Sequence, residues 1–208
     1  MAAIASSVAA ASAACPARMP GDANNNWIRV PAVTAHECSE IRGQIIKDKR
    51  IPFNYAHPNH AVPCVKGFVQ TRVVRSTKTS ELHFYYQVFP SYGDQSMKGD
   101  IIEQVTLYSF KWNQTWIGYR PDGPGTISPV SAAWLYGSDS IIRIKLPMKA
   151  YGDKDKNLYF GSGDKTRWIV IKTKAKDIAA IDENGMMDLK TFGHGYTIRI
   201  HGMFVPKK

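Results

Sequence analysis

The residues in this sequence with the clearest metal-binding chemistry are two histidines and a cysteine in one short segment. His57 and His60 lie in AHPNHAVPC, which ends at Cys64. Imidazole and thiolate groups bind zinc, but this spacing matches no standard zinc motif. The prolines in the segment favour an extended chain. We therefore predict a surface loop and no metal site.

Three glycine-containing segments are predicted to be turns. GSGD at 161–164 lacks the Lys-Ser/Thr ending of a phosphate-binding loop, and DGPG at 122–125 and DENG at 182–185 combine residues that favour turns. The sequence has no G-x-S-x-G or H-E-x-x-H pattern. Catalytic groups often come from distant segments, so an enzyme stays an alternative, but we predict no enzyme activity, no catalytic residue and no cofactor.

The cysteines are three in number and follow no CxxC or Cys/His zinc spacing: Cys15, Cys38 and Cys64. An odd count without a pattern predicts neither a disulfide framework nor a structural metal. A reducing compartment fits this expectation best.

Basic residues outnumber acidic ones, with 27 Lys+Arg against 17 Asp+Glu and a formal charge of +10. Such a surplus attracts polyanions such as nucleic acid or an anionic membrane, although it also keeps many proteins soluble. The cations gather in two places, which we expect to form one phosphate-binding face or, alternatively, a solvated surface: Arg42, Lys47, Lys49 and Arg50, then Lys66, Arg72, Arg75 and Lys78.

Aromatic residues offer a second kind of nucleic-acid contact, because their rings stack on bases or sugars. More often such residues fill a sandwich core or a subunit interface, and this is the interpretation we favour. The residues concerned are Phe84, Tyr85, Tyr86, Trp112, Trp116 and Trp134.

Three regions must position these groups. Residues 1–26 are rich in Ala and Ser and predict a flexible arm, with a cleaved signal peptide as the alternative. Residues 27–61 contain TAHECSEIRGQIIKDKR, in which Thr34 and Glu37 have capping-box spacing and isoleucines follow at helical intervals, so a short helix is predicted. Residues 62–208 are predicted to form the folded domain. No apolar stretch approaches the roughly 20 residues of a membrane-spanning helix, so we expect no membrane partner.

From about residue 62 the chain divides into short runs of β-branched and aromatic residues separated by turn residues, which predicts strands at 64–74, 81–89, 101–110, 115–121, 141–147, 166–174 and 196–205, with a shorter one at 157–160. Alternation predicts a half-buried strand at 141–147 and a strand covered on both sides at 166–174. A second short helix is predicted at 130–137. The predicted fold is all-β, an antiparallel jelly-roll sandwich with one or two short helices.

The order of these segments from about residue 100 to 206 resembles the coat proteins of the Bromoviridae, the plant-virus family that includes cucumber mosaic virus, ilarviruses and anulaviruses. The resemblance lies in IIEQVTLYSF, TWIGYRPDGP, VSAAWLYGSDS, NLYF, TRWIVIKTK and YTIRIHGMFVP. It implies a jelly-roll subunit that assembles with many copies of itself into an icosahedral or related shell around single-stranded RNA, in the virion and, during assembly, in the host cytoplasm. The family's basic N-terminal arm is missing, since Arg18 is the one basic residue in 1–26.

On this interpretation the inner face of the shell would bind RNA, and the candidate residues are Arg18, Arg42, Lys47, Lys49, Arg50, Lys66 and Arg72. Candidate subunit-interface residues are Trp27, Trp112, Trp134, Val205 and Lys207. Three alternatives stay open: a secreted or surface sandwich that binds carbohydrate or protein, a single-strand nucleic-acid-binding protein that forms no shell, and an enzyme.

Overall fold

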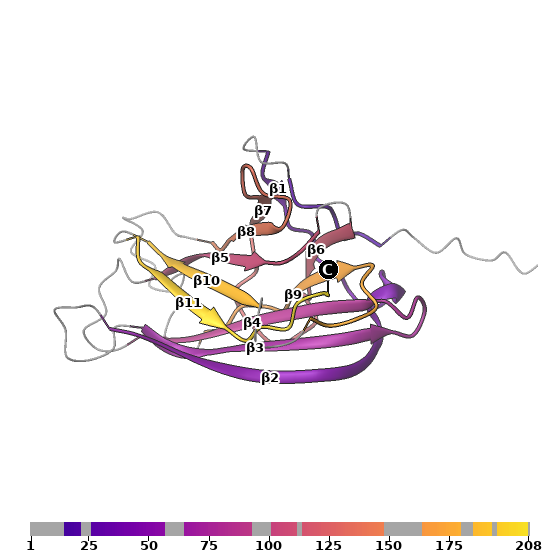
Figure 1. Ribbon diagram of the computed structural model, residues 1–208, viewed down its shortest axis with the longest axis horizontal. Helices are drawn as coiled ribbons and strands as arrows, with labels where there is room; N and C mark the ends of the chain where they lie inside the picture. Colours follow the sequence, from indigo (N-terminus) through magenta and orange to yellow (C-terminus); the bar gives the residue numbers. More distant parts are fainter. Residues whose placement is uncertain are drawn as a thin grey trace, which may run out of the picture.

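The computed structural model describes residues 15–21, 26–56, 65–92, 101–111, 114–147, 164–179, 185–192 and 195–207. In these residues the chain forms two antiparallel sheets packed as a sandwich (Figure 1), which confirms the all-β prediction. The strands are β1 (Ile28–Arg29), β2 (Gly43–Tyr55), β3 (Val65–Ser76), β4 (Leu82–Tyr92), β5 (Ile102–Tyr108), β6 (Thr115–Tyr119), β7 (Ser131–Trp134), β8 (Ile141–Lys145), β9 (Ile169–Thr173), β10 (Met186–Thr191) and β11 (Thr197–His201).

The two sheets share the strands unequally. Sheet A has five strands in the order β2-β3-β4-β9-β6, and sheet B has six in the order β1-β7-β8-β5-β10-β11. Several neighbours are far apart in sequence, such as β4 beside β9 and β5 beside β10. The chain therefore crosses repeatedly from one sheet to the other.

Alternating side chains build the core between the sheets. In β8, Ile142 and Ile144 are fully buried while Lys145 is exposed, as the alternation predicts. In β9 three successive residues, Ile169, Val170 and Ile171, are buried, so this strand is covered on both sides. Its outer cover is a second apolar cluster, formed by Val33, Cys38, Ile41, Val74, Tyr85, Trp168 and Val170.

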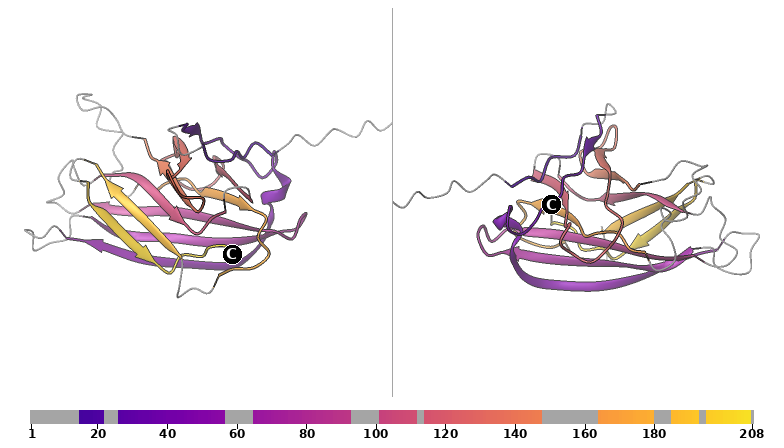
Figure 2. Two further views of the ribbon diagram at one scale, coloured as in Figure 1. Left: turned by 45° about the horizontal axis from the view of Figure 1, so that its top comes forward. Right: turned by 180° about the vertical axis from the view of Figure 1, so that it is seen from behind.

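An N-terminal segment, which we call the strap and which comprises the described residues 15–21 and 26–33, closes one side of the sandwich (Figure 2). The backbone of Arg18 exchanges hydrogen bonds with Ile117 of β6, and Gly21 exchanges them with β7. Residues 28–33 then cross back, since β1 pairs with β7 and Val33 bonds to Tyr119 of β6. Within the predicted flexible arm, residues 15–21 are therefore attached to both sheets.

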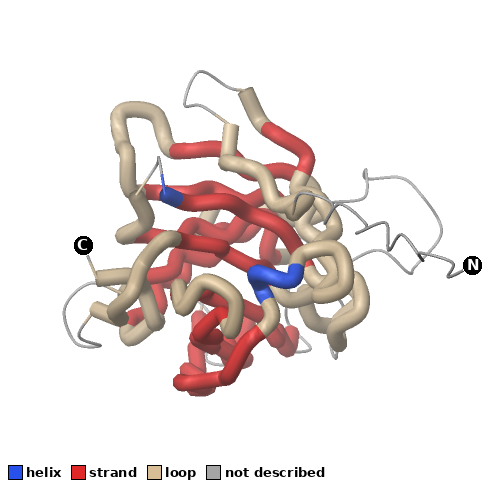
Figure 3. Tube along the Cα trace, turned by 90° about the vertical axis from the view of Figure 1, so that its right-hand side faces the viewer, coloured by secondary structure: helices blue, strands red, loops and turns tan. Residues whose placement is uncertain are grey.

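Of the two predicted helices, one is reduced to a single turn and the other is wrong. Of the helix expected after Thr34, one 3₁₀ turn exists, η1 (Ser39–Ile41), and the chain is extended from Arg42 onward (Figure 3). The reason is tertiary: Gly43 packs against the backbone of Arg75, and β2 pairs along its length with β3. Residues 131–134 likewise form β7, because pairing with β1 and β8 outweighs the helical preference of the alanines.

The predicted strand runs correspond to β3, β4, β5, β6, β8, β9 and β11. Sequence patterns did not indicate β1, β2 or β10 as strands. The predicted strand at 157–160 lies outside the described residues.

Candidate nucleic-acid interface on sheet A

Sheet A has an outer face that points away from sheet B. On β3, Val65, Val69 and Val73 point into the core, so the alternating residues between them point outward. Strand register places residues of β2 and β4 beside these on the same face. The resulting surface contains Asp48, Arg50, Pro52 and Asn54 on β2, Lys66, Phe68, Gln70 and Arg72 on β3, and Tyr85, Gln87 and Phe89 on β4.

One end of this outer face is an aromatic platform with cations over it. Phe68 and Phe89 are cross-strand partners whose rings stack with centroids 4.2 Å apart. The guanidinium of Arg50 lies 4.9 Å from the Phe68 centroid, and the ammonium of Lys165 lies 5.3 Å from that of Phe89. A groove of about 710 Å³ runs past the two rings and Lys66. These cations can hold phosphates, and a base that displaces Arg50 or Lys165 from its ring can stack in its place.

The other end of the outer face is a groove of about 420 Å³ lined by Arg42, Arg72, Arg120, Tyr85 and Trp168. The guanidinium of Arg72 lies 4.7 Å from the Trp168 ring centroid. Arg72 and Lys66 are six residues apart on β3, which corresponds to about 20 Å. The platform and this groove therefore form one track across the sheet.

Carboxylates neutralise part of this charge. Asp48 binds Arg72 at 2.6 Å and Asp122 binds Arg120 at 2.7 Å. Hydrogen bonding to the Arg120 guanidinium holds the pKa of the Asp122 carboxyl below its ordinary value, so this pair is charged at neutral pH.

Four further cations have no carboxylate partner among the described residues: Arg42, Arg50, Lys66 and Lys165. Three of them are exposed and Lys165 is partly buried. Asp164 lines the platform groove as well, but the cations of the outer face still outnumber its carboxylates and leave a positive surplus. Such a surplus binds phosphates without reading sequence.

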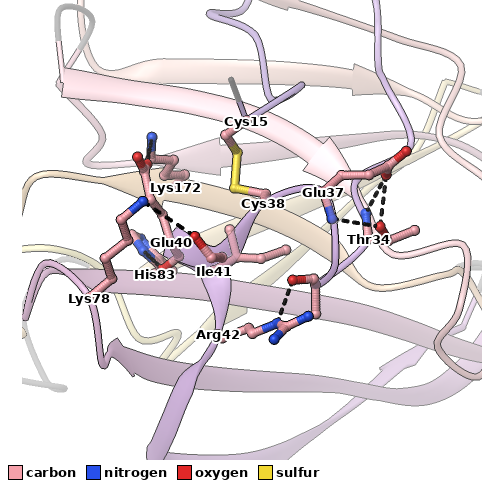
Figure 4. Close-up of a disulfide and its surroundings, with 12 residues drawn as sticks. Cys15, Thr34, Glu37, Cys38, Glu40, Ile41, Arg42, Lys78, His83 and Lys172 are labelled. Atoms are coloured by element: carbon pink, nitrogen blue, oxygen red, sulfur yellow. Dashed lines mark hydrogen bonds and ion pairs between the residues drawn. A yellow bond between two sulfur atoms is a disulfide. The ribbon is translucent and has the colours of Figure 1, made fainter. Parts of the chain in front are cut away.

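The wall of the second groove is a braced loop, residues 34–42 (Figure 4). Thr34 and Glu37 form reciprocal hydrogen bonds, so the capping-box pair exists although no long helix follows it. The Nε of Arg42 donates to the Ala35 carbonyl, and the Tyr85 hydroxyl donates to the Ile41 carbonyl at 2.9 Å. Burial raises the pKa of Tyr85 to about 12, which keeps that hydroxyl a donor.

A disulfide between Cys15 and Cys38 fastens this loop to the strap (Figure 4). The expectation of no disulfide is therefore wrong, and the compartment inferred from it loses its basis. Sequence could not pair the two cysteines, because their proximity comes from the strap folding back along β6. Cys64 lies outside the described residues.

His83 on β4, for which the sequence suggested no role, also supports this loop. Its Nδ1 accepts from the Thr173 N–H at 3.3 Å, so its Nε2 carries the proton and donates to the Glu40 carbonyl at 2.9 Å. Burial lowers the pKa of His83. Glu40 itself pairs with Lys172, which lowers the pKa of the Glu40 carboxyl.

The predicted RNA-binding residues separate into groups. Arg42, Arg50, Lys66 and Arg72 contribute to the track, and Arg18 is exposed beside β6. Lys47 and Lys49 pair with Val73 and Thr71, whose side chains point to the core side of sheet A. The prediction of one face for the whole cluster is therefore wrong for Lys47 and Lys49, because neighbours in a strand point to opposite sides.

The predicted subunit-interface residues also lie in different environments, some buried and some on the surface. Trp134 and Val205 are buried in the core of the single chain, at 0% and 2% exposure, so their side chains present no surface to another subunit. Trp27 lies on the outer side of sheet B beside the cations of Arg143 and Lys145. Lys207 is exposed, and Trp112 is outside the described residues.

Among the aromatics, Phe84 and Tyr86 are buried between the sheets, which confirms the core interpretation for them, whereas Tyr85 is buried on the outer side in the second apolar cluster. The platform residues Phe68 and Phe89, together with Arg120 and Lys165, were missed. Alternation along β3 would have placed Lys66, Phe68 and Arg72 on one face. Pairing Phe68 with Phe89, however, requires the register, which sequence did not supply.

Comparisons with protein-family models, curated proteins and solved structures found no match to this chain. Within the described residues there is no helix long and apolar enough to span a membrane. The same residues contain no group of three or more potential metal ligands. His57 and His60 lie outside them.

Proposed function

We propose that this chain is a coat-protein subunit that assembles with copies of itself into a shell and packages single-stranded RNA. The observation that carries the proposal is the track on sheet A, where unneutralised cations lie over or beside stacked aromatic rings. The role is structural, with no catalytic step. The virion, and the host cytoplasm during assembly, are its expected locations.

The ligand chemistry follows from the track. A base that displaces Arg50 or Lys165 from Phe68 or Phe89 can stack there whatever its identity, and the cations neutralise phosphates without sequence preference. A duplex hides its bases, so an aromatic platform favours a single strand.

Support for a coat subunit comes from the fold and the sequence pattern. The chain crosses repeatedly between two antiparallel sheets, as jelly-roll and other Greek-key sandwiches do. A jelly-roll relationship to the Bromoviridae coat proteins is part of the proposal. RNA would offset the repulsion among subunits of charge +10.

The test is size-exclusion chromatography of the expressed protein, recorded at 260 and 280 nm, with electron microscopy of the leading peak. Particles with nucleic-acid absorbance are expected. The variant Lys66→Ala/Lys165→Ala should package less RNA, whereas Lys111→Ala/Lys207→Ala, which removes two cations away from sheet A's outer face, should package the normal amount. A subunit that stays unassembled with RNA across salt and pH would refute the proposal.

The disulfide favours a second candidate, a secreted or surface sandwich that binds carbohydrate or protein, because disulfides persist in oxidising compartments. N-terminal mass spectrometry of the natively expressed protein distinguishes the two. Cleavage ahead of Cys15, together with a stable monomer that ignores RNA, would favour this candidate over the coat subunit.

A further inference from the structure

The edge strand β2 has an unused hydrogen-bonding side. It spans Gly43–Tyr55 and pairs on one side with β3, while no described residue pairs with its other side (Figure 1). At the opposite edge of sheet A, the strap covers β6. Exposed strand edges are templates for pairing with another chain.

Two interruptions bracket a short regular segment of this edge. A register shift lies between Ile45 and Lys47, and Pro52, which has no N–H to donate, follows Ile51. Between them, Lys47–Ile51 is an unbroken ladder with Lys49 at its midpoint. An antiparallel pairing of this segment with its own copy would therefore be centred on Lys49.

Charge selects the same register independently. A two-fold axis normal to the sheet keeps the outer faces of both copies on one side, and residues directly opposite must then share a face. Centring on Lys49 places Asp48 opposite Arg50 of the second copy, twice. Centring on Asp48 or on Arg50 would also place like charges opposite each other, and it would form no such ion pair to offset them.

We infer that β2 pairs with β2 of a second copy through Lys47–Ile51, joining two sheets A into one continuous sheet. The inference names the contact for the self-assembly proposed above and rests on that proposal. Asp48 would then lie between Arg72 of its own chain and Arg50 of the other. The two RNA tracks would form one surface.

One feature of this interface is repulsive. Lys49 meets its own copy at the axis, on the core side, where its Nζ lies near Gly202. Like charges directly opposite oppose pairing. Lys49→Ala should therefore strengthen the dimer.

The experiment uses complementary charge swaps in RNA-free full-length protein, followed by sedimentation velocity. Arg50→Glu places Glu opposite Asp48, and Asp48→Lys places Lys opposite Arg50, so each variant alone should dimerise about tenfold more weakly or worse. Mixing the two variants restores both ion pairs across the axis, so heterodimers should form more strongly than either variant alone, although Asp48→Lys also removes the partner of Arg72. This rescue also shows that both variants are folded.

A wild-type chain that is monomeric at every concentration overturns the inference, as does a dimer that neither swap weakens or that mixing fails to rescue. RNA binding is measured separately with Lys66→Ala/Lys165→Ala, which should dimerise normally. Normal RNA packaging without β2 pairing would refute the inferred β2–β2 interface and leave the proposed function standing. Rescue by mixing in a protein that does not bind RNA would support the interface and refute the proposed function.

Discussion

Asp188 on the outer side of sheet B is a carboxylate buried among its partners, with a side-chain exposure of 9%. Arg199 donates to it twice at 2.9 Å, and the Tyr108 hydroxyl donates at 2.6 Å. Burial favours the neutral acid, but these hydrogen bonds outweigh it and lower the pKa of Asp188. The charged form is therefore the one that stabilises the fold.

We expect Asp188→Asn to lower the free energy of unfolding at pH 7 by about 1–3 kcal/mol, because the neutral amide accepts weaker hydrogen bonds than the carboxylate. Because the pKa of Asp188 is lower in the folded state, its charged form stabilises the fold at pH values above its unfolded-state pKa near 4. This stabilisation is lost as the pH falls through the folded-state pKa. The difference between variant and wild type should therefore shrink in acid. Urea unfolding across pH measures it, with exposed Asp139→Asn as the control that changes nothing.

Phe68→Ala is expected to weaken binding of a single-stranded oligonucleotide by about 1–3 kcal/mol, because it removes half of the stacked platform. Phe192→Ala, at an exposed aromatic residue on the other sheet, should leave the affinity unchanged. Fluorescence anisotropy measures both. Equal affinities for the two variants would mean that bases do not stack on Phe68.

For individual residues, the sequence predicted which residues could bind phosphate better than it predicted which residues contact each other. It predicted cations at Arg50, Lys66 and Arg72 as phosphate ligands, and these share a face. It did not predict that Asp48 would neutralise Arg72. That pair depends on the register between β2 and β3, which is fixed by packing over the whole strands.

The strap and the braced loop form one element held by the disulfide. Cys15→Ser, or reduction, should lower the free energy of unfolding by about 3 kcal/mol, since the bond closes a loop of 23 residues and so restricts the unfolded chain. Hydrogen exchange should rise first at Arg18 and Ile117, which the strap pairs. The variant should not respond further to reductant, and an equal stability with and without the bond would contradict this account.

Gly67 lets β3 and β4 approach closely. A Cβ there would lie 2.0 Å from the Phe89 carbonyl oxygen, so Gly67→Ala must move backbone and should cost about 2 kcal/mol or more. At Gly137, where φ is +72° and no atom lies within 4 Å of the added Cβ, alanine should cost only about 1 kcal/mol from backbone strain. Thermal unfolding of the two variants compares them, and equal losses would show that the close approach does not matter.

The sequence predicted correctly the strands that are rich in β-branched and aromatic residues. It predicted helices at two places where the chain mainly forms strands. The capping-box contact between Thr34 and Glu37 is real, but a local contact does not continue a helix when the following residues are paired in a sheet. In β7 the alanines occupy a site between β1 and β8, where pairing decides the conformation. These outcomes depend on contacts that are distant in sequence.

For the whole molecule, the arrangement of charge matters more than its sum. Lys66→Ala/Lys165→Ala and Lys111→Ala/Lys207→Ala each reduce the formal charge from +10 by two. If net charge alone attracted RNA, the two variants would bind alike. If the track is the site, only the first loses phosphate contacts, and its logarithmic dependence of affinity on salt should be shallower by about 1.4, at about 0.7 for each contact.

Titrations of a single-stranded oligonucleotide at several salt concentrations measure that slope for each variant. The control variant should keep the wild-type slope, because Lys111 and Lys207 lie beside Thr115 and Thr173 at the end of the sandwich and away from the outer face of sheet A. Equal slopes in the two variants would place the RNA elsewhere on the protein. Since each slope counts phosphates contacted and does not depend on total affinity, a variant that is merely less stable would leave its slope unchanged, so a shallower slope in the first variant alone localises RNA to the track.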